Sequence, residues 1–197
     1  MIMNKGNEGL SFKQAQEVVN KLGGMGGVKR FLSGELMVVP VKRNWKSWKT
    51  IKCDARLESV ENFQGLYENS GCFLTGSVRK VFRRLSFDTQ TKEVDLVKVS
   101  VEDLGFDGKV SRRDIYRRAE ELGLRLCLDG DGPRLRLQYL DQPYSEKFVI
   151  AMKPVVDAAE HLYLFGLERN DEGLWLVSHT GNSESFWMPD DEFVFRK

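Results

Sequence analysis

The feature that most constrains the fold is a regular alternation of apolar and polar residues in the second half of the chain. It is clearest in residues 124–128 and 135–139, where leucine and tyrosine alternate with polar side chains. A period of two is typical of strands with one buried and one wet face. Turns rich in Asp, Gly and Pro separate the segments. Similar runs continue at residues 148–152, 162–168, 174–177 and 193–195. This half is predicted to form an antiparallel β meander.

One amphipathic helix is predicted to cover the dry face of this meander. Ser111 is a suitable N-cap, and Asp114 stands three residues later, where its carboxylate meets the helix start. Val110 and Ile115 occupy the two positions of a hydrophobic staple, and Gly123 ends the helix. The predicted fold class is therefore α+β.

The first half is predicted to be mainly helical. Ser11 and Gln14 form a capping box at the start of a helix with one apolar stripe. Gly23 and Gly24 end that helix, and a short second helix follows at residues 28–32, which gives an N-terminal helical hairpin. A further helix is expected at residues 77–85. Strands are expected at residues 36–39 and 94–101.

Charge and patterning divide the chain into a mainly helical basic region, residues 1–90, and an α+β antiparallel-sheet domain, residues 91–197. Residues 1–100 carry 17 Lys or Arg against 10 Asp or Glu, whereas residues 101–197 carry 13 against 19. Residues 87–92 are polar and are the expected linker. The alternative is one compact domain in which the two halves attract each other.

The composition indicates an ordinary globular protein of the cytoplasm. The chain has 197 residues, of which 41% are apolar and 30% charged. Its apolar runs fall far short of the roughly 20 residues that a membrane span needs, so no membrane partner is expected. Met1 is followed within a few residues by polar ones, unlike a signal peptide. Three widely spaced cysteines, Cys53, Cys72 and Cys127, do not suggest a disulfide framework.

Several short stretches resemble a group of uncharacterised bacterial proteins of similar length. The likeness rests on the stretches at residues 103–106, 114–116 with 119, 122–124, 135–139 and 141–143, and extends to residues 22–24, 27–28 and 193–195. No activity is known for that group. The resemblance therefore implies a bacterial, cytosolic origin and implies no catalytic residue.

The motifs that would indicate a cofactor or a metal are missing from the sequence. Glycines 23, 24, 26 and 27 fit neither phosphate-loop spacing and follow a helix, so a helix-helix turn is favoured over nucleotide binding and over a helix-turn-helix. His161 and His179 lack partners at metal-ligand spacing, and Asp129 and Asp131 fit a tight turn better than a calcium loop. We therefore expect no metal and no cofactor.

Two basic segments stand out instead. On the helix at residues 77–85, the apolar stripe leaves Arg79, Lys80, Arg83 and Arg84 on the opposite side with no acid among them. Like charges at i, i+4 repel, which suggests either an anionic partner or the acidic half as counter-charge. The arginines of residues 112–118 differ, because Glu120 and Glu121 share their outer face.

The second basic segment interleaves aromatic and cationic residues. It contains Lys42, Arg43, Trp45, Lys46, Trp48, Lys49 and Lys52. In an extended conformation such a segment stacks bases on its tryptophans while its lysines follow phosphates. The alternative, which we favour, is that both tryptophans fill the core while the lysines reach outward.

The sequence predicts a binding or regulatory module rather than an enzyme. Its basic half would contact an anionic partner, with nucleic acid first and an acidic protein second. One alternative is a small hydrolase or nuclease of unrecognised type, with a site on the C-terminal sheet near His179, Tyr139, Arg136 and Asp141. Another is a protein-interaction scaffold, a dimer through an exposed sheet edge.

Overall fold

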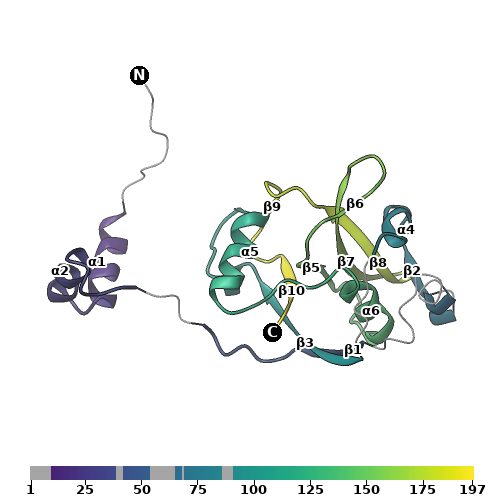
Figure 1. Cartoon of the computed structure of the whole chain (residues 1–197), viewed down its shortest axis with the longest axis horizontal. Coiled ribbons are helices and arrows are strands. Elements are labelled where there is room, and N and C mark those ends of the chain that lie inside the picture. Colours follow the sequence, from purple (N-terminus) through teal and green to yellow (C-terminus); the bar gives the residue numbers. More distant parts are fainter. Residues whose placement is uncertain (1–9, 39–41, 54–64, 68, 86–90) are drawn as a thin grey trace, which may run out of the picture. The chain divides into compact units, whose positions relative to one another are not determined.

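The computed structural model describes residues 10–38, 42–53, 65–67, 69–85 and 91–197 (Figure 1). The chain divides into two compact units, Met1–Pro40 and Val41–Lys197. No helix in the described ranges is long and apolar enough to cross a membrane.

The smaller unit is a helical hairpin of α1 (Phe12–Lys21) and α2 (Met25–Leu32). The Ser11 hydroxyl accepts from the Gln14 backbone N–H, and the Gln14 side chain accepts from the Ser11 N–H, so the capping box is formed. Glycine is required at the turn: Gly23 and Gly24 have φ of 85° and 82°. A Cβ on Gly27 would lie only 1.6 Å from the Leu22 carbonyl oxygen. The glycine cluster therefore shapes a tight helix-helix connection.

The larger unit is built on a curled, mostly antiparallel sheet. Along the described chain eight strands belong to it, seven of them in the order β1 (Lys49–Cys53), β3 (Lys92–Ser100), β10 (Glu192–Arg196), β5 (Lys147–Ile150), β7 (Leu162–Asn170), β8 (Gly173–Thr180) and β2 (Cys72–Leu74). The eighth, β6 (Val155–Val156), pairs with β7. A small second sheet joins β4 (Val110–Ser111) to β9 (Phe186–Trp187).

The core lies on both faces of the central strand β10. Phe193, Val194 and Phe195 are all fully buried. The two phenylalanines meet the Tyr116 ring of α5 (Arg112–Glu121) edge to face, with ring centroids 6.3 and 6.0 Å apart. A short 3₁₀ turn, η2 (Glu102–Leu104), packs beside α5. Helix α5 thus covers one face, as its Ser111 cap and apolar stripe predict.

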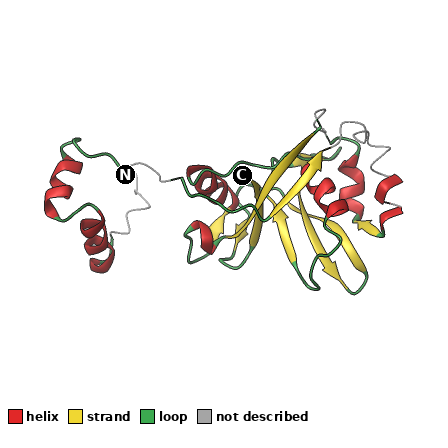
Figure 2. Cartoon of the chain, turned by 90° about the horizontal axis from the view of Figure 1, so that it is seen from below, coloured by secondary structure: helices red, strands yellow, loops and turns green. Residues whose placement is uncertain are grey.

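A second helix, α6 (Asp131–Gln138), contacts β1, β7 and β8. The Gln138 side chain both accepts from and donates to the backbone of Lys52 in β1, each bond being 2.9 Å. At the other end of the strand order, the Cys72 thiol of β2 meets the Arg136 carbonyl. The first and last strands of this order, β1 and β2, therefore both contact α6. Helix α4 (Gly76–Phe82) packs on β8, and Figure 2 shows helices to either side of the sheet.

The predicted strand at residues 135–139 is wrong, because these residues belong to α6 and its C-cap. The alternation was misleading because Arg134 and Arg136, assigned to the wet face, are buried as deeply as Leu135. Residues 124–128 form only isolated bridges, at Arg125 and Cys127. Residues 36–38 form no strand, and residue 39 lies outside the described residues.

The predicted meander is also corrected. The sheet contains two parallel pairs, β10 with β5 and β2 with β8. Strands from both sides of residue 90 belong to it, since β1 pairs with β3 and β2 with β8. The compact units thus divide at residue 40 rather than near residue 90, and most of the expected linker, residues 86–90, lies outside the described residues. The mixed composition of helices and a mostly antiparallel sheet agrees with the broader prediction.

Candidate anion-binding surface

Helix α4 is held against the sheet by its apolar side. Val78 and Val81 are fully buried, and the Phe82 ring meets Tyr67 edge to face at 5.8 Å. The Ser77 hydroxyl is 2.6 Å from that of Ser178 in β8, which fixes the start of the helix. This anchoring determines which side of α4 faces solvent.

The solvent side of α4 and of the turn that follows it carries four exposed cations, which we call the α4 basic face. They are Arg79, Lys80, Arg83 and Arg84. The first two lie in the helix, the third is its C-cap and the fourth lies in the turn. Arg79 Nε donates to the Leu74 carbonyl and Arg84 Nη1 to that of Val156, each at 3.2 Å. These bonds orient two guanidinium groups without neutralising them. Among the described residues, no carboxylate forms an ion pair with any of the four, so their positive charge is offered to solvent.

Helix α5 provides the contrast. Arg113 pairs with Glu184 at 3.0 Å, Arg117 with Asp114 at 2.8 Å and Arg118 with Glu121 at 3.1 Å. Two helices of similar basic composition therefore differ in their electrostatics. The charge of α5 is balanced by its own neighbours, and that of α4 is not.

The cations of residues 42–52 are placed differently. Arg43 donates to the Asp103 carbonyl at 2.6 Å, and the Lys42 side chain packs over Gly123. Lys49 is paired with Asp141 at 3.6 Å and lies 3.9 Å from the centre of the Tyr139 ring. Lys42, Lys46 and Lys52 are exposed and form no side-chain hydrogen bond or ion pair among the described residues.

Trp45 and Trp48 are half-buried and pack against the core. The Trp45 indole N–H donates to the Leu122 carbonyl at 3.0 Å. Trp48 meets Tyr139 and Phe148 edge to face, at 5.2 and 5.3 Å. Their rings thus serve packing, as the alternative favoured from the sequence predicts. The two basic segments adjoin different strands, β1 and β2, which stand at opposite ends of the strand order.

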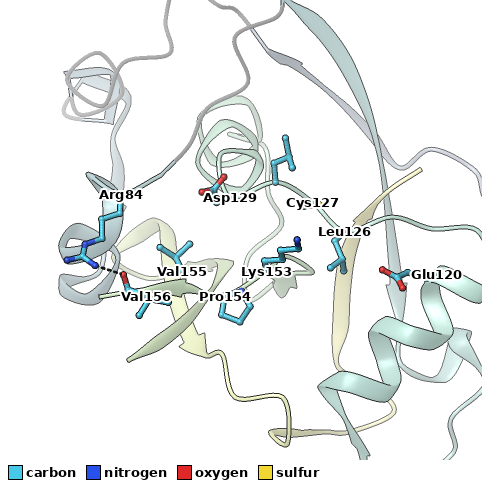
Figure 3. Close-up of a pocket in the computed structure, with 10 residues that line it drawn as sticks. Arg84, Glu120, Leu126, Cys127, Asp129, Lys153, Pro154, Val155 and Val156 are labelled. Atoms are coloured by element: carbon cyan, nitrogen blue, oxygen red, sulfur yellow. Dashed lines mark hydrogen bonds between the residues drawn. The ribbon is translucent and has the colours of Figure 1, made fainter. Parts of the chain in front are cut away.

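Beside Arg84 lies a pocket of about 640 Å³ that the sequence did not indicate (Figure 3). Its walls are apolar, from Leu126, Pro154 and Val155, and Lys153 adds a second cation. Glu120 and Asp129 also line it. The sequence gives no sign that Lys153 and Arg84 line one pocket, because only the fold brings them together.

Cys127 lines the same pocket but offers no nucleophile. Its side chain is buried, and its thiol is 3.5 Å from the Val194 carbonyl oxygen. Burial raises the pKa of this thiol well above its ordinary value, and the nearby Asp131 carboxylate raises it further. The thiol is therefore held in its unreactive protonated form.

His179 lines a separate pocket of about 310 Å³ together with Glu168, Trp187 and residues 190–192. Its ring lies over β7, where a Cβ on Gly166 would be 2.5 Å from Nε2. None of the described residues lining this pocket is Ser, Thr or Cys. In the described part of the chain, no group of three or more His, Cys, Asp or Glu could hold a metal ion.

The other residues proposed beside His179 are engaged in separate contacts. Tyr139 donates to Glu146 at 2.9 Å, Asp141 pairs with Lys49, and Arg136 is fully buried at the end of α6. None of the three lines the His179 pocket. The structure therefore does not gather this set around one cavity.

We expect stability to fall in mild acid because of His179. Its pKa lies below the ordinary value, mainly because burial disfavours the charged ring, with Lys147 adding to the effect and Glu168 and Asp191 opposing it. In mild acid the unfolded chain therefore binds a proton that the folded chain does not. The stability that neutral His179 contributes is complete above about pH 6.5 and is lost as pH falls through the folded pKa. Urea unfolding at a series of pH values measures it.

In that experiment the free energy of unfolding of His179→Gln should fall less than that of the wild type between neutral and mildly acidic pH. The exposed His161 lies outside this pocket and pairs with Asp157, so His161→Gln should not make the fall shallower. An unchanged profile in His179→Gln contradicts the assignment.

Comparisons of the chain with models of known protein families, with curated proteins and with solved structures find no match. The resemblance to the bacterial group therefore stays a prediction. The function has to be argued from the surfaces of the molecule itself.

Proposed function

We propose that the chain is a non-catalytic binding module whose α4 basic face contacts an anionic partner, with nucleic acid as the first candidate. One observation carries the proposal: four exposed cations share one side of a firmly anchored helix, and no described carboxylate pairs with them. Uncompensated like charges at i, i+4 cost a few tenths of a kcal/mol per pair in the free protein. A partner's phosphates would remove that repulsion.

The composition of the face favours phosphate over carboxylate. Three of its four members are arginines, whose planar guanidinium groups bind phosphate oxygens in pairs. The residues 79–84 span about 7.5 Å along the helix axis, at about 1.5 Å per residue. Successive phosphates of one strand in a duplex are about 3.4 Å apart along its axis, so the face covers two or three of them. An acidic protein is the second candidate.

The pocket beside Arg84 extends the same surface. Lys153 and Arg84 both line it, so a backbone crossing α4 would meet a further cation beyond the helix. Apolar walls of Leu126 and Pro154 lie next to these charges. Glu120 and Asp129 line the pocket as well, so its cations are matched by carboxylates, and the preference for negative charge rests on the α4 basic face alone.

The test compares two pairs of charge-neutralising substitutions. Lys80→Gln with Arg83→Gln removes two cations of the face that form no hydrogen bond among the described residues. Arg113→Gln with Arg117→Gln removes two cations of α5 that are already ion-paired and exposed. Both variants lose the same net charge, and neither touches the apolar side of its helix. Only the α4 variant should weaken binding.

Binding to mixed-sequence DNA and RNA, single- and double-stranded, is measured over a range of salt concentrations. The slope of log K against log salt should shrink in the α4 variant by about 1.8 on duplex DNA, which is about 0.9 for each lost phosphate contact, and by about 1.4 on single strands, about 0.7 for each. The α5 variant should keep the wild-type slope. Equal losses in the two variants, or no wild-type binding at low salt, would overturn the nucleic-acid proposal. Binding to polyglutamate alone would favour the acidic protein.

A further inference from the structure

The helical hairpin at the N-terminus lacks an interior of its own. Its two helices have 10 and 8 residues, and none of these residues is buried. Isolated helices shorter than about 12–15 residues are marginal in water. Units below about 40 residues usually need a disulfide, a metal or a partner to be stable. The described hairpin has no cysteine, so a partner surface would supply the burial that it lacks.

The hairpin exposes an unusual amount of apolar surface. In the described part of this unit, eight large apolar side chains are exposed: Leu10, Phe12, Val18, Met25, Phe31, Leu32, Met37 and Val38. Phe12 is 87% exposed and Leu32 77%. At about 25 cal/mol per Å², the 1.5–3 kcal/mol gained by burying a Val, Leu, Phe or Met side chain corresponds to about 60–120 Å² each, so the eight offer on the order of 800 Å². Two such surfaces together reach about 1,600 Å², the size of a standard stable interface.

Two of the four cations of the described hairpin lie near carboxylates. Lys21 pairs with Glu17 at 3.2 Å, and Arg30 lies 3.9 Å from Glu35. With Lys13 and Lys29, the described hairpin carries four cations against two carboxylates. Its net charge is thus modest, and apolar burial is the expected driving force for association.

We propose that the hairpin binds a second copy of itself, so that two chains associate through a four-helix arrangement. A twofold interface places the same apolar patch on both sides, and each hairpin covers the other with one association. Short antiparallel helix pairs with apolar stripes are the usual units of such bundles. The inference is independent of the α4 basic face, which belongs to the other compact unit.

The test measures the mass of the full chain in solution against concentration. A dimer is expected at micromolar concentrations. Phe12→Gln with Leu32→Gln should raise the dissociation constant on the order of 100-fold, because each substitution enters a twofold interface twice and removes apolar burial. Glutamine is a good helix former, so the helices keep their propensity.

The matched control is Lys13→Gln with Lys29→Gln, which changes exposed polar positions beside the apolar ones on the same two helices. It should leave the dissociation constant within a few-fold of wild type. A chain that stays monomeric at high micromolar concentration would overturn the proposal, whether the hairpin then binds lipid vesicles or its own larger unit. A dimer unaffected by the Phe12 and Leu32 substitutions would overturn it too, by placing the interface elsewhere.

Disulfide trapping gives a second readout of the same association. The three native thiols are all buried, so a cysteine introduced at the exposed Leu32 would react selectively. Mild oxidation of Leu32→Cys should yield a covalent dimer, and Lys80→Cys on α4 should not. Equal trapping at both positions would indicate random collision and contradict the proposal.

Discussion

Replacing Asp131 with alanine is expected to lower the free energy of unfolding by about 3–5 kcal/mol, because it removes a buried carboxylate that pairs with the largely buried Arg196. Asp131 is 1% exposed and receives two bonds from Arg196, of 2.6 and 2.7 Å. It also accepts from the Leu128 backbone N–H at 2.8 Å and lies 3.5 Å from Arg134. One carboxylate thus binds the last strand, the start of α6 and the segment before it.

The control for this prediction is an ion pair at the surface. Glu184→Ala removes the partner of Arg113, with both side chains more than half exposed, and should cost at most about 1 kcal/mol. Urea unfolding of the two variants measures the difference. The double variant Asp131→Ala with Arg196→Met should recover part of the loss, since no charge on Arg196 remains to be compensated. Equal effects of Asp131→Ala and Glu184→Ala would contradict the prediction.

The second large effect is expected at Arg136, which is fully buried. Its guanidinium donates to the Gln142 side-chain oxygen and to the Tyr139 carbonyl. Burial lowers the pKa of this arginine. Arg136→Met keeps much of the volume but leaves two interior acceptors without a donor. At about 1–3 kcal/mol for each orphaned group, the loss should be about 2–6 kcal/mol.

Arg125 provides the comparison for Arg136. It is exposed, and its guanidinium donates only to the Lys197 carbonyl within the described residues. Arg125→Met should therefore change stability by less than about 1 kcal/mol. Adding Gln142→Leu to Arg136→Met removes one orphaned acceptor and should restore part of the loss. If Arg136→Met is as mild as Arg125→Met, the buried bonds contribute little.

Local signals in the sequence predicted the elements whose packing is local. Ser111 caps α5, with its hydroxyl accepting from the Asp114 N–H at 3.2 Å, and Ile115 and Ala119 are fully buried as the stripe requires. The strands β7 and β8 follow from alternating residues joined by the turn at residues 170–173. The α4 basic face was predictable for the same reason, because helical spacing alone separates its cations from Val78 and Val81.

Features that depend on distant partners were not predictable. The alternation at residues 134–139 indicated a strand because arginine was assumed to face water. In the structure Asp131 and Gln142 provide interior partners for such cations. The parallel pairing of β2 with β8 and the meeting of Lys153 with Arg84 likewise arise from the fold. No residue pattern within a single segment predicts these long-range contacts.

The pairing of β2 with β8 affects how the α4 basic face forms when the chain folds. Residues 72–74 pair with residues 174–176, whereas β7 and β8 are joined by a tight turn. Closing so long a loop costs more chain entropy than closing a hairpin. Helix α4 follows β2 directly and rests on β8. The surface with which the protein would meet its partner is thus attached to a long-range strand pairing rather than to a local hairpin.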